Sequence, residues 1–535
     1  MSERERSQDQ VDSAGGADAD APTGDGRRRS GRRRGRGRDS APAVLTQAPF
    51  QQVRRRFAPT ELVDGDQLDA IHQASLLVLQ DVGIDVLEPA ARKIFADAGC
   101  VVEDERVRFD PEMVLEAVSH SPSQFTLHAR NPERNVEIGG DNVVFTSVGS
   151  PPNVSDVAGG RRTGNHDDFQ KLVKLSQYFN SIHLHAGYPV EPADLHPSVR
   201  HLHATYDLLT LSDKAINAYS LGRERNQDCI EMIRIARGVS TEQLDREPSL
   251  HTVINTSSPL RLDIPMCQGI IEHATHGQLS IITPFTLAGA MAPVTIVGAV
   301  TQQNAEALAG IALAQLVRPG APVAYGGFTS NVDMRSGSPA FGTPEFMKAA
   351  LLGGQLARRY GLPYRSSNVN AANAVDAQAG YESVFSLWGA IMGGANIVFH
   401  GAGWLEGGLR ASYEKLVLDA DLLAMMQTFL EPLRVDNDEL ALDAIADVGP
   451  GGHFFGTQHT QDRYREAFYM PFISDWRNFE SWAEAGSPTA QDHAVGVVER
   501  ALEEYTEPFL DPEIRDKLDA FVRRRVDEGG VATDY

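Results

Sequence analysis

The fold is decided by the stretch IITPFTLAGAMAPVTIVGAVTQQNAEALAGIALAQLVRPGAPVAYG, residues 281–326. Its two ends, 281–283 and 323–326, are short apolar runs, typical of strands buried on both faces of a parallel sheet. Between them, 296–317 has the apolar spacing of a long helix. A strand, a helix and a second strand in this order predict one unit of an α/β fold.

The same alternation continues on both sides of this unit. We predict strands at 143–146, 182–185, 215–219, 253–256, 281–283, 323–326, 364–366 and 397–400. Helices are predicted at 166–178, 197–210, 225–237, 262–275, 296–317, 344–360, 377–392 and 413–430. Eight short strands, each followed by a helix, predict a (β/α)8 TIM barrel over residues 141–432.

Two further regions flank the predicted barrel. Residues 57–140 are expected to form an N-terminal α+β cap, with helices at 67–83 and 89–99 and β stretches at 101–108 and 124–129. Residues 433–535 are expected to form a C-terminal helical extension, with an aromatic stretch and helices near 488–505 and 511–526.

The N-terminal residues differ from the rest in charge. Residues 1–56 hold 13 arginines, no lysine and eight acidic residues, whereas the whole chain of 535 residues has a net charge of −23. The arginine run RRRSGRRRGRGR at 27–38 lies in a segment almost without large apolar side chains, so we predict a disordered arm. The arm is interpreted as a solubilising extension, with a phosphate- or RNA-contacting tail as the alternative.

The remaining chain excludes several classes of protein. Its acidity disfavours nucleic acid as a partner of the main domain. No apolar run approaches the roughly 20 residues of a membrane span, and no signal-peptide core is present. Three widely spaced cysteines exclude a disulfide framework. We therefore expect a cytoplasmic protein.

In a barrel of this kind the active site lies at the carboxyl ends of the strands. Those ends hold neither a carboxylate nor a lysine, which disfavours proton abstraction and Schiff-base chemistry. They are aromatic and neutral, and aromatic rings stabilise a quaternary ammonium, which cannot donate a hydrogen bond. The candidate rings are Phe145, Tyr219, Phe285, Tyr325, Phe328 and Trp404.

His183 and His185 form a His-x-His pair at the predicted end of the second strand. Such a pair places both imidazoles on one face, as in metal-dependent barrel hydrolases. A complete metal site would need further His residues and an Asp on later strands. The last predicted strand ends in His400 and not in an Asp. Hydrogen-bonded histidines are the favoured interpretation, and we expect no bound metal.

Four segments carry a resemblance to a known family. They are VDMRSGSPAFGTPE at 332–345, DAQAGYE at 376–382, GAGWLEGGLRASYEKLVLDADLL at 401–423 and GPGGHFFGTQHT at 449–460. Through them the chain resembles, over roughly residues 60–530, the trimethylamine methyltransferase (MttB-like) superfamily of corrinoid-dependent methyltransferases. The resemblance implies a TIM barrel and methyl transfer from a methylated amine to the Co(I) of a separate corrinoid protein, which docks over the barrel mouth. It implies no cofactor bound directly to this chain.

One departure from the family pattern bears on the substrate. Trimethylamine-active members carry pyrrolysine just before the segment that corresponds to DAQAGYE, and this position falls close to Asn373. Pyrrolysine is thought to activate a tertiary amine, whereas a quaternary amine already has a neutral leaving group. This chain has neither pyrrolysine nor lysine at that position. The absence of pyrrolysine favours a quaternary amine as the substrate, such as glycine betaine, another betaine or carnitine.

These considerations assign roles to individual residues. Asn373 and His400 are predicted to be catalytic and, with Asn368 and Gln378, to orient the polar end of the substrate, while Trp404 and Glu406 shape the mouth. No general base is required, since catalysis comes from positioning and exclusion of water. We also expect a homo-oligomer.

Three functions remain as alternatives to methyl transfer from a quaternary amine. They are a methyltransferase for trimethylamine or another methylamine, a metal-dependent barrel hydrolase, and a non-catalytic betaine-binding protein.

Overall fold

The computed structural model describes residues 45–532. The arginine run at 27–38 lies outside the described residues, and so does most of the predicted arm. Residues 45–56, which we assigned to that arm, contain strand β1 (Val53–Arg54), which pairs antiparallel with β7 (Asn142–Ser147).

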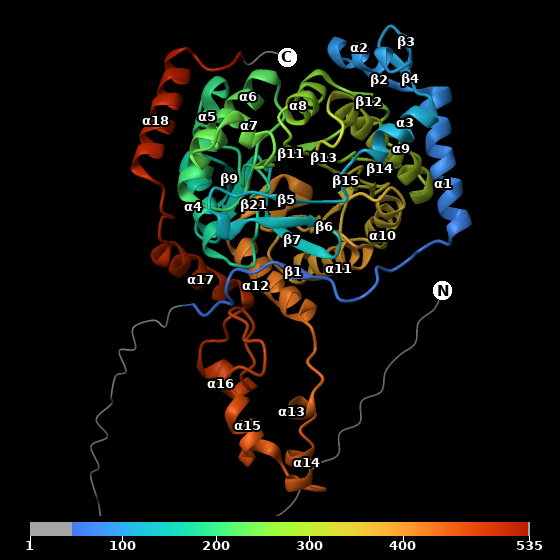
Figure 1. Ribbon diagram of the computed structural model, residues 1–535. Coiled ribbons are helices and arrows are strands. Elements are labelled where there is room, and N and C mark those ends of the chain that lie inside the picture. The colour runs from blue at the N-terminus through green and yellow to red at the C-terminus, as the bar shows by residue number, and fades with distance from the viewer. Residues whose placement is uncertain (1–44, 533–535) are drawn as a thin grey trace, which may run out of the picture. The chain divides into compact units, whose positions relative to one another are not determined.

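A curled sheet lies at the centre of the fold (Figure 1). Its strand order is β1-β7-β19-β18-β15-β13-β11-β10, and all neighbours except β1 and β7 are parallel. The remaining strands are β10 (Ile216–Asn217), β11 (Leu250–Ile254), β13 (Leu279–Ile282), β15 (Val323–Gly326), β18 (Tyr364–Ser367) and β19 (Ile397–Ala402). The predicted α/β class is confirmed, and seven of the eight predicted strands overlap these elements.

The prediction of a strand at 182–185 is wrong. Leu184 alone forms bridges there, one parallel bridge to Thr146 and one to Ala215. The backbone N–H groups of His183 and His185 also donate to the carbonyls of Phe145 and Ala215, but no regular strand results. The physical reason lies in β1, whose Val53 pairs with Val143 and thereby occupies the first part of the edge of β7. On the rest of that edge, the Phe145 backbone N–H donates to the His183 imidazole and not to a backbone carbonyl, which interrupts the pairing with residues 182–185.

The helices that follow the strands surround the sheet (Figure 1). They are α4 (His166–Tyr178), α5 (Pro197–Leu211), α6 (Arg223–Arg237), α8 (Ile264–Thr275), α9 (Ile296–Val317), α10 (Pro344–Arg359), α11 (Ala377–Gly393) and α12 (Tyr413–Leu430). Helix α9 begins as predicted because the Thr295 side chain accepts a hydrogen bond from the Gly298 backbone N–H. It is buried along most of its length because α8, α10 and helices of the predicted cap region all pack against it.

The region 57–140, for which we predict a cap, contains α1 (Gly65–Leu77), a π-helical turn (Val78–Val82), β2 (Ile84–Val86), α2 (Pro89–Asp97), β3 (Val101–Glu103), β4 (Arg106–Arg108), α3 (Pro111–Ser119), β5 (Gln124–Leu127) and β6 (Val136–Gly139). Its division from the rest of the chain as a separate domain stays a prediction. Its small sheet, β2 to β4, also takes up β12 (Arg261–Leu262). This pairing joins the cap to the loop that follows β11.

Short strands in the loops after the central strands form two further sheets. One contains β8 (Asn153–Asp156), β9 (Gly160–Thr163), β20 (Trp404–Leu405) and β21 (Arg410–Ser412), and the other β14 (Leu287–Ala288), β16 (Ser330–Val332) and β17 (Pro339–Ala340). A short helix, α7 (Thr241–Leu244), precedes β11. These sheets fix the loops in place, including the loop that carries Trp404.

After α12 the chain forms the short helices α13 (Asn437–Leu440), α14 (Leu442–Val448), α15 (Gln458–Arg463) and α16 (Phe479–Glu484), then α17 (Ala490–Glu504) and α18 (Pro512–Asp527). Helix α17 packs on α12, and α18 packs on α5 and α6.

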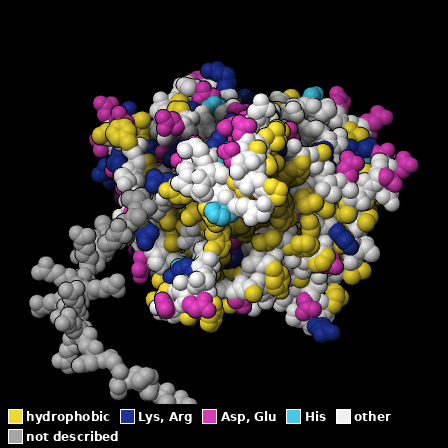
Figure 2. Space-filling view, turned by 90° about the horizontal axis from the view of Figure 1, so that it is seen from below, with side chains coloured by type: hydrophobic (Ala, Val, Ile, Leu, Met, Phe, Trp, Pro, Cys, Tyr) yellow, Lys and Arg dark blue, Asp and Glu magenta, His cyan; other side chains and the backbone are white. Residues whose placement is uncertain are grey.

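The segment 431–488 exposes many large apolar side chains, among them Leu433, Phe455, Phe468, Trp476 and Phe479. Figure 2, viewed from the side on which this segment lies, shows hydrophobic side chains gathered on that face. No helix between residues 45 and 532 is long and apolar enough to cross a membrane.

Candidate active site at the mouth of the sheet

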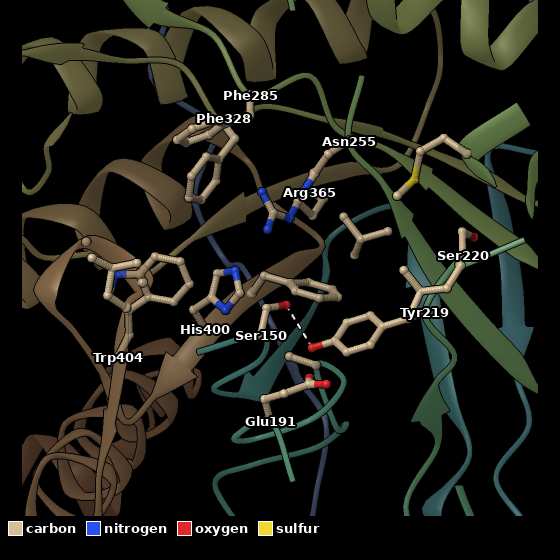
Figure 3. Close-up of a pocket in the computed structure, with 18 residues that line it drawn as sticks. Ser150, Glu191, Tyr219, Ser220, Asn255, Phe285, Phe328, Arg365, His400 and Trp404 are labelled. Atoms are coloured by element: carbon tan, nitrogen blue, oxygen red, sulfur yellow. Dashed lines mark hydrogen bonds between the residues drawn. The ribbon is translucent and has the colours of Figure 1, made fainter. Parts of the chain in front are cut away.

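A cavity of about 530 Å³ opens at the carboxyl ends of the parallel strands (Figure 3). This is the edge at which such folds place their active sites. The residues that line it are Ser150, Ala186, Glu191, Tyr219, Ser220, Leu221, Val253, Asn255, Met266, Phe285, Phe328, Arg365, Phe399, His400, Trp404, Gly407, Gly408 and Leu409. Five of the eleven predicted site residues are among them: Tyr219, Phe285, Phe328, His400 and Trp404.

One wall of the cavity is aromatic. The Phe285 and Phe328 rings, from the loops after β13 and β15, lie 5.1 Å apart between centroids. Trp404 lies 6.2 Å from Phe328 and 4.0 Å from the His400 imidazole. Aromatic rings grouped in this way can stabilise a cation, including a quaternary ammonium, which needs no hydrogen-bond acceptor.

His400 adopts a backbone conformation that is uncommon for its residue type. Its φ is +53°, and it lies in β19 where the register with β7 shifts between Val398 and Ala402. Such a bulge re-aims a side chain, and the strained φ points to a functional constraint. Burial lowers the pKa of His400 well below its ordinary value, and the nearby Arg365 lowers it further. The imidazole is therefore neutral at pH 7.

The opposite wall is polar. The hydroxyls of Ser150 and Tyr219 are 2.8 Å apart (Figure 3). The Tyr219 hydroxyl also accepts a hydrogen bond from the Tyr188 backbone N–H at 3.1 Å. Burial raises the pKa of Tyr219, so its phenol is neutral. The Glu191 carboxylate forms an ion pair with Arg200 at 2.5 Å.

The cavity holds two charged residues that the strand ends did not reveal. Our expectation of a lining poor in charge is corrected by Arg365, in β18, and by Glu191, in the loop that follows Leu184. The sequence contained a signal that could have identified Arg365, because an ionised residue is unusual within a short buried strand such as YRSS at 364–367. Glu191 lies in an irregular loop, and no sequence pattern placed it at the mouth.

The other six predicted residues lie outside the lining. Phe145 and Tyr325 are fully buried, and Asn368 donates a hydrogen bond to the Gly401 carbonyl. Gln378 donates to Glu382, Glu406 pairs with Arg161 at 3.0 Å, and Asn373 is exposed, with its carbonyl accepting from Arg410. Their predicted contacts with substrate stay predictions.

His183 and His185 are both buried and engaged within the protein. Nδ1 of His183 accepts from the Phe145 backbone N–H, and Nε2 of His185 lies 2.7 Å from the Ser212 hydroxyl. Burial lowers their pKa values to about 4 and about 3. Within residues 45–532, no group of three or more His, Cys, Asp or Glu is arranged to hold a metal ion. The hydrolase alternative thus has no ligand set in this part of the chain.

Comparison with known proteins agrees with the motif resemblance. The family model described as "Trimethylamine methyltransferase (MTTB)" matches residues 28–530. The chain is 38% identical to a glycine betaine methyltransferase of Desulfitobacterium hafniense over 466 residues, covering 87% of this chain and 97% of the relative. It is 30% identical to trimethylamine methyltransferase MttB1 of Methanosarcina mazei, covering 85% and 93%.

A crystal structure titled as a hydroxylamine MtmB complex has a similar fold, with a TM-score of 0.50 at 12% identity over 84% of this chain and 90% of the other. The family match extends over nearly all of the chain, and it includes the four segments on which the resemblance was noted. The chain therefore belongs to the trimethylamine methyltransferase family.

Proposed function

We propose that the chain transfers a methyl group from a quaternary amine of the glycine betaine type to the Co(I) of a separate corrinoid protein. The observation that carries this proposal is the aromatic wall formed by Phe285, Phe328 and Trp404 beside a neutral His400. The similarity to a glycine betaine methyltransferase supports the same substrate class.

The proposed chemistry needs no acid or base from this chain. The methyl carbon is attacked in line by the acceptor, the C–N bond breaks, and its electron pair stays on nitrogen, which leaves as a neutral tertiary amine. The role of the chain is to hold the donor in line with the acceptor and to exclude water. The neutral His400 and Tyr219 of the lining are consistent with this chemistry.

The acceptor is proposed to belong to a corrinoid protein that docks over the mouth, so that this chain binds no corrinoid of its own. The support for this docking position is the location of the cavity, whose lining comes from the carboxyl ends of the strands and the loops that follow them. We further propose that the curled sheet closes as a (β/α)8 barrel, with Leu184 as a second strand reduced to one residue.

Self-association stays a prediction. Its support is the apolar surface of segment 431–488, since exposed apolar patches of this kind mark association sites. A second copy of the chain is the proposed occupant. Light scattering of the full chain should give a mass above 58.2 kDa, and a monomer at micromolar concentration would contradict this.

The transfer is tested by mixing the purified chain with a reduced corrinoid protein and a panel of methylated amines. We expect loss of the Co(I) absorption and gain of the methyl-cobalt absorption with glycine betaine, together with release of the demethylated amine. Transfer from trimethylamine, with no quaternary amine active, would overturn the substrate assignment. Tight betaine binding without transfer would instead favour the non-catalytic binding protein.

A further inference from the structure

Arg365 is a buried cation in the wall of the cavity. It lies in β18, only 2% of its surface is exposed, and Figure 3 shows its guanidinium directed into the cavity between Phe328 and His400. Within residues 45–532, its Nε has no hydrogen-bond partner, and the one hydrogen bond of its side chain joins Nη1 to the Gly327 carbonyl at 3.4 Å. A guanidinium has five N–H donors, so most of this capacity is unused.

The guanidinium is held in position by aromatic rings rather than by an anion. Its central carbon lies 4.8 Å from the centroid of Phe399 and 5.1 Å from that of Phe328. Burial lowers the pKa of Arg365 to about 9, which is still above neutrality, so the side chain carries its charge at pH 7.

The protein supplies no carboxylate to this cation. No ion pair joins Arg365 to any Asp or Glu in the part of the chain that the structure describes. The carboxylate of the lining, Glu191, is paired with Arg200. A buried charge without a partner is unfavourable, and an anion that enters the cavity would remove this imbalance.

We propose that Arg365 binds the carboxylate of the methyl donor, so that the substrate is a zwitterion with a quaternary ammonium and a carboxylate on one small molecule. This inference rests on the proposed function and narrows its substrate class. A carboxylate fits the fork of a guanidinium with two parallel hydrogen bonds. The quaternary ammonium of the same molecule then binds against the aromatic wall.

The same charge excludes donors that are only cationic. Choline or a trimethylammonium ion would bring a second positive charge into a low-dielectric cavity that already holds Arg365, while the carboxylate of the lining, Glu191, is already paired with Arg200. Arg365 would thus select betaines by attraction and reject simple methylated amines by repulsion.

Three ligands of closely similar shape separate the two charges. Glycine betaine carries both, choline carries only the cation, and 3,3-dimethylbutanoate carries only the anion, because a tert-butyl group replaces the trimethylammonium. Their binding is measured by calorimetry on the full chain and on the Arg365→Gln and Arg365→Lys variants. Arg237→Gln is the matched control, since Arg237 is also an arginine held inside the fold but pairs with Glu247, and neither residue lines the cavity.

In the unmodified chain we expect glycine betaine to bind more tightly than choline. Arg365→Gln should weaken binding of glycine betaine and of 3,3-dimethylbutanoate by about 100-fold and leave choline binding unchanged or stronger. Arg365→Lys should restore part of the loss, and Arg237→Gln should leave the affinities for all three ligands unchanged. If Arg365→Gln fails to fold, the Arg365→Lys variant and the ratio of glycine betaine to choline in the unmodified chain carry the test.

The outcomes separate this inference from the proposed function. If glycine betaine donates its methyl group but the Arg365 variants keep the preference for betaine over choline, the inference is overturned and the function stands. If no quaternary amine donates a methyl group but 3,3-dimethylbutanoate binding still depends on Arg365, the anion site stands and the function is overturned.

Discussion

Arg365 and Lys415 are both buried cations, and their surroundings differ. Lys415, on α12, is 1% exposed, and its ammonium donates to Asp419 at 2.5 Å and to the Ser383 hydroxyl at 2.8 Å. Arg365, in the cavity wall, touches aromatic rings and one distant carbonyl. The charge at α12 is neutralised within the fold, whereas the charge in the cavity is left for a ligand.

This difference separates a contribution to stability from a contribution to binding. Asp419 also accepts a hydrogen bond from the Gly403 backbone N–H at 2.9 Å, next to Trp404, so the Lys415 pair anchors the loop that closes one side of the cavity. Removing a member of that pair leaves a buried charge unmatched. Removing Arg365 takes away a charge that was already unmatched.

The largest effect is expected from Asp419→Ala. It strips Lys415 of its carboxylate and should lower the free energy of unfolding by about 3–5 kcal/mol, as loss of one partner of a buried pair does. Urea denaturation measures the change. As a control, Lys415→Met combined with Asp419→Leu removes both charges and should recover much of the loss. A change below about 1 kcal/mol in the single variant would contradict the view that the Lys415–Asp419 pair stabilises the fold.

Phe328→Leu should have the next largest effect. The Phe328 ring lines the cavity and also contacts the Arg365 guanidinium, so its removal should weaken binding of glycine betaine and choline alike, by about 3- to 30-fold, since a cation–π contact contributes about 0.5–2 kcal/mol. Calorimetric titration measures both affinities. Phe341→Leu is the matched control, because that ring is buried next to Phe328 but is not in the lining. Equal losses in both variants would contradict a specific role.

Arg365→Met should change stability little. The variant loses ring contacts with Phe328 and Phe399 but also removes an unpaired buried charge. We therefore expect a free energy of unfolding within about 1 kcal/mol of the unmodified chain, or above it. The same urea titration measures this value beside that of Asp419→Ala. A loss as large as the one at Asp419 would show that Arg365 serves the fold.

The smallest effect concerns pH. The pKa of His400 lies well below its ordinary value and that of Arg365 is about 9, so between pH 6 and 8 the imidazole stays neutral and the guanidinium stays charged. Affinity for glycine betaine should then change less than about 2-fold over this range and fall only above pH 9, as Arg365 loses its proton. A steep change between pH 6 and 7 would indicate that His400 titrates in the site.

Helices and strands with a clear local signal could be predicted from the sequence. Helix α9 was predicted with its observed bounds because an apolar run follows the Thr295 cap, and β15 was predicted with its bounds as a short apolar run. The stretch at 182–185, Ile-His-Leu-His, was also predicted as a strand but forms only the Leu184 bridges, because β1, distant in sequence, pairs with part of the same edge of β7. Such competition between distant segments has no local signature.

The site was predicted in part for a similar reason. The aromatic residues Phe285, Phe328 and Trp404 follow strands directly, so the position of each strand end placed them at the cavity. Arg365 lies inside the strand predicted at 364–366 and not after its end, and the absence of a carboxylate partner for it is a property of the three-dimensional structure. Asn368 was placed by the same reasoning but turns to the Gly401 carbonyl instead.

The location of Arg365 in a strand has a consequence for how this scaffold can diversify. In most barrel enzymes the loops change while the strands persist, and new substrates are acquired through the loops. Here the residue that would demand a carboxylate is part of β18 itself. Exchange of the mouth loops could alter the size and shape of the accepted betaine, but a move to uncharged or purely cationic donors would require a substitution in the sheet.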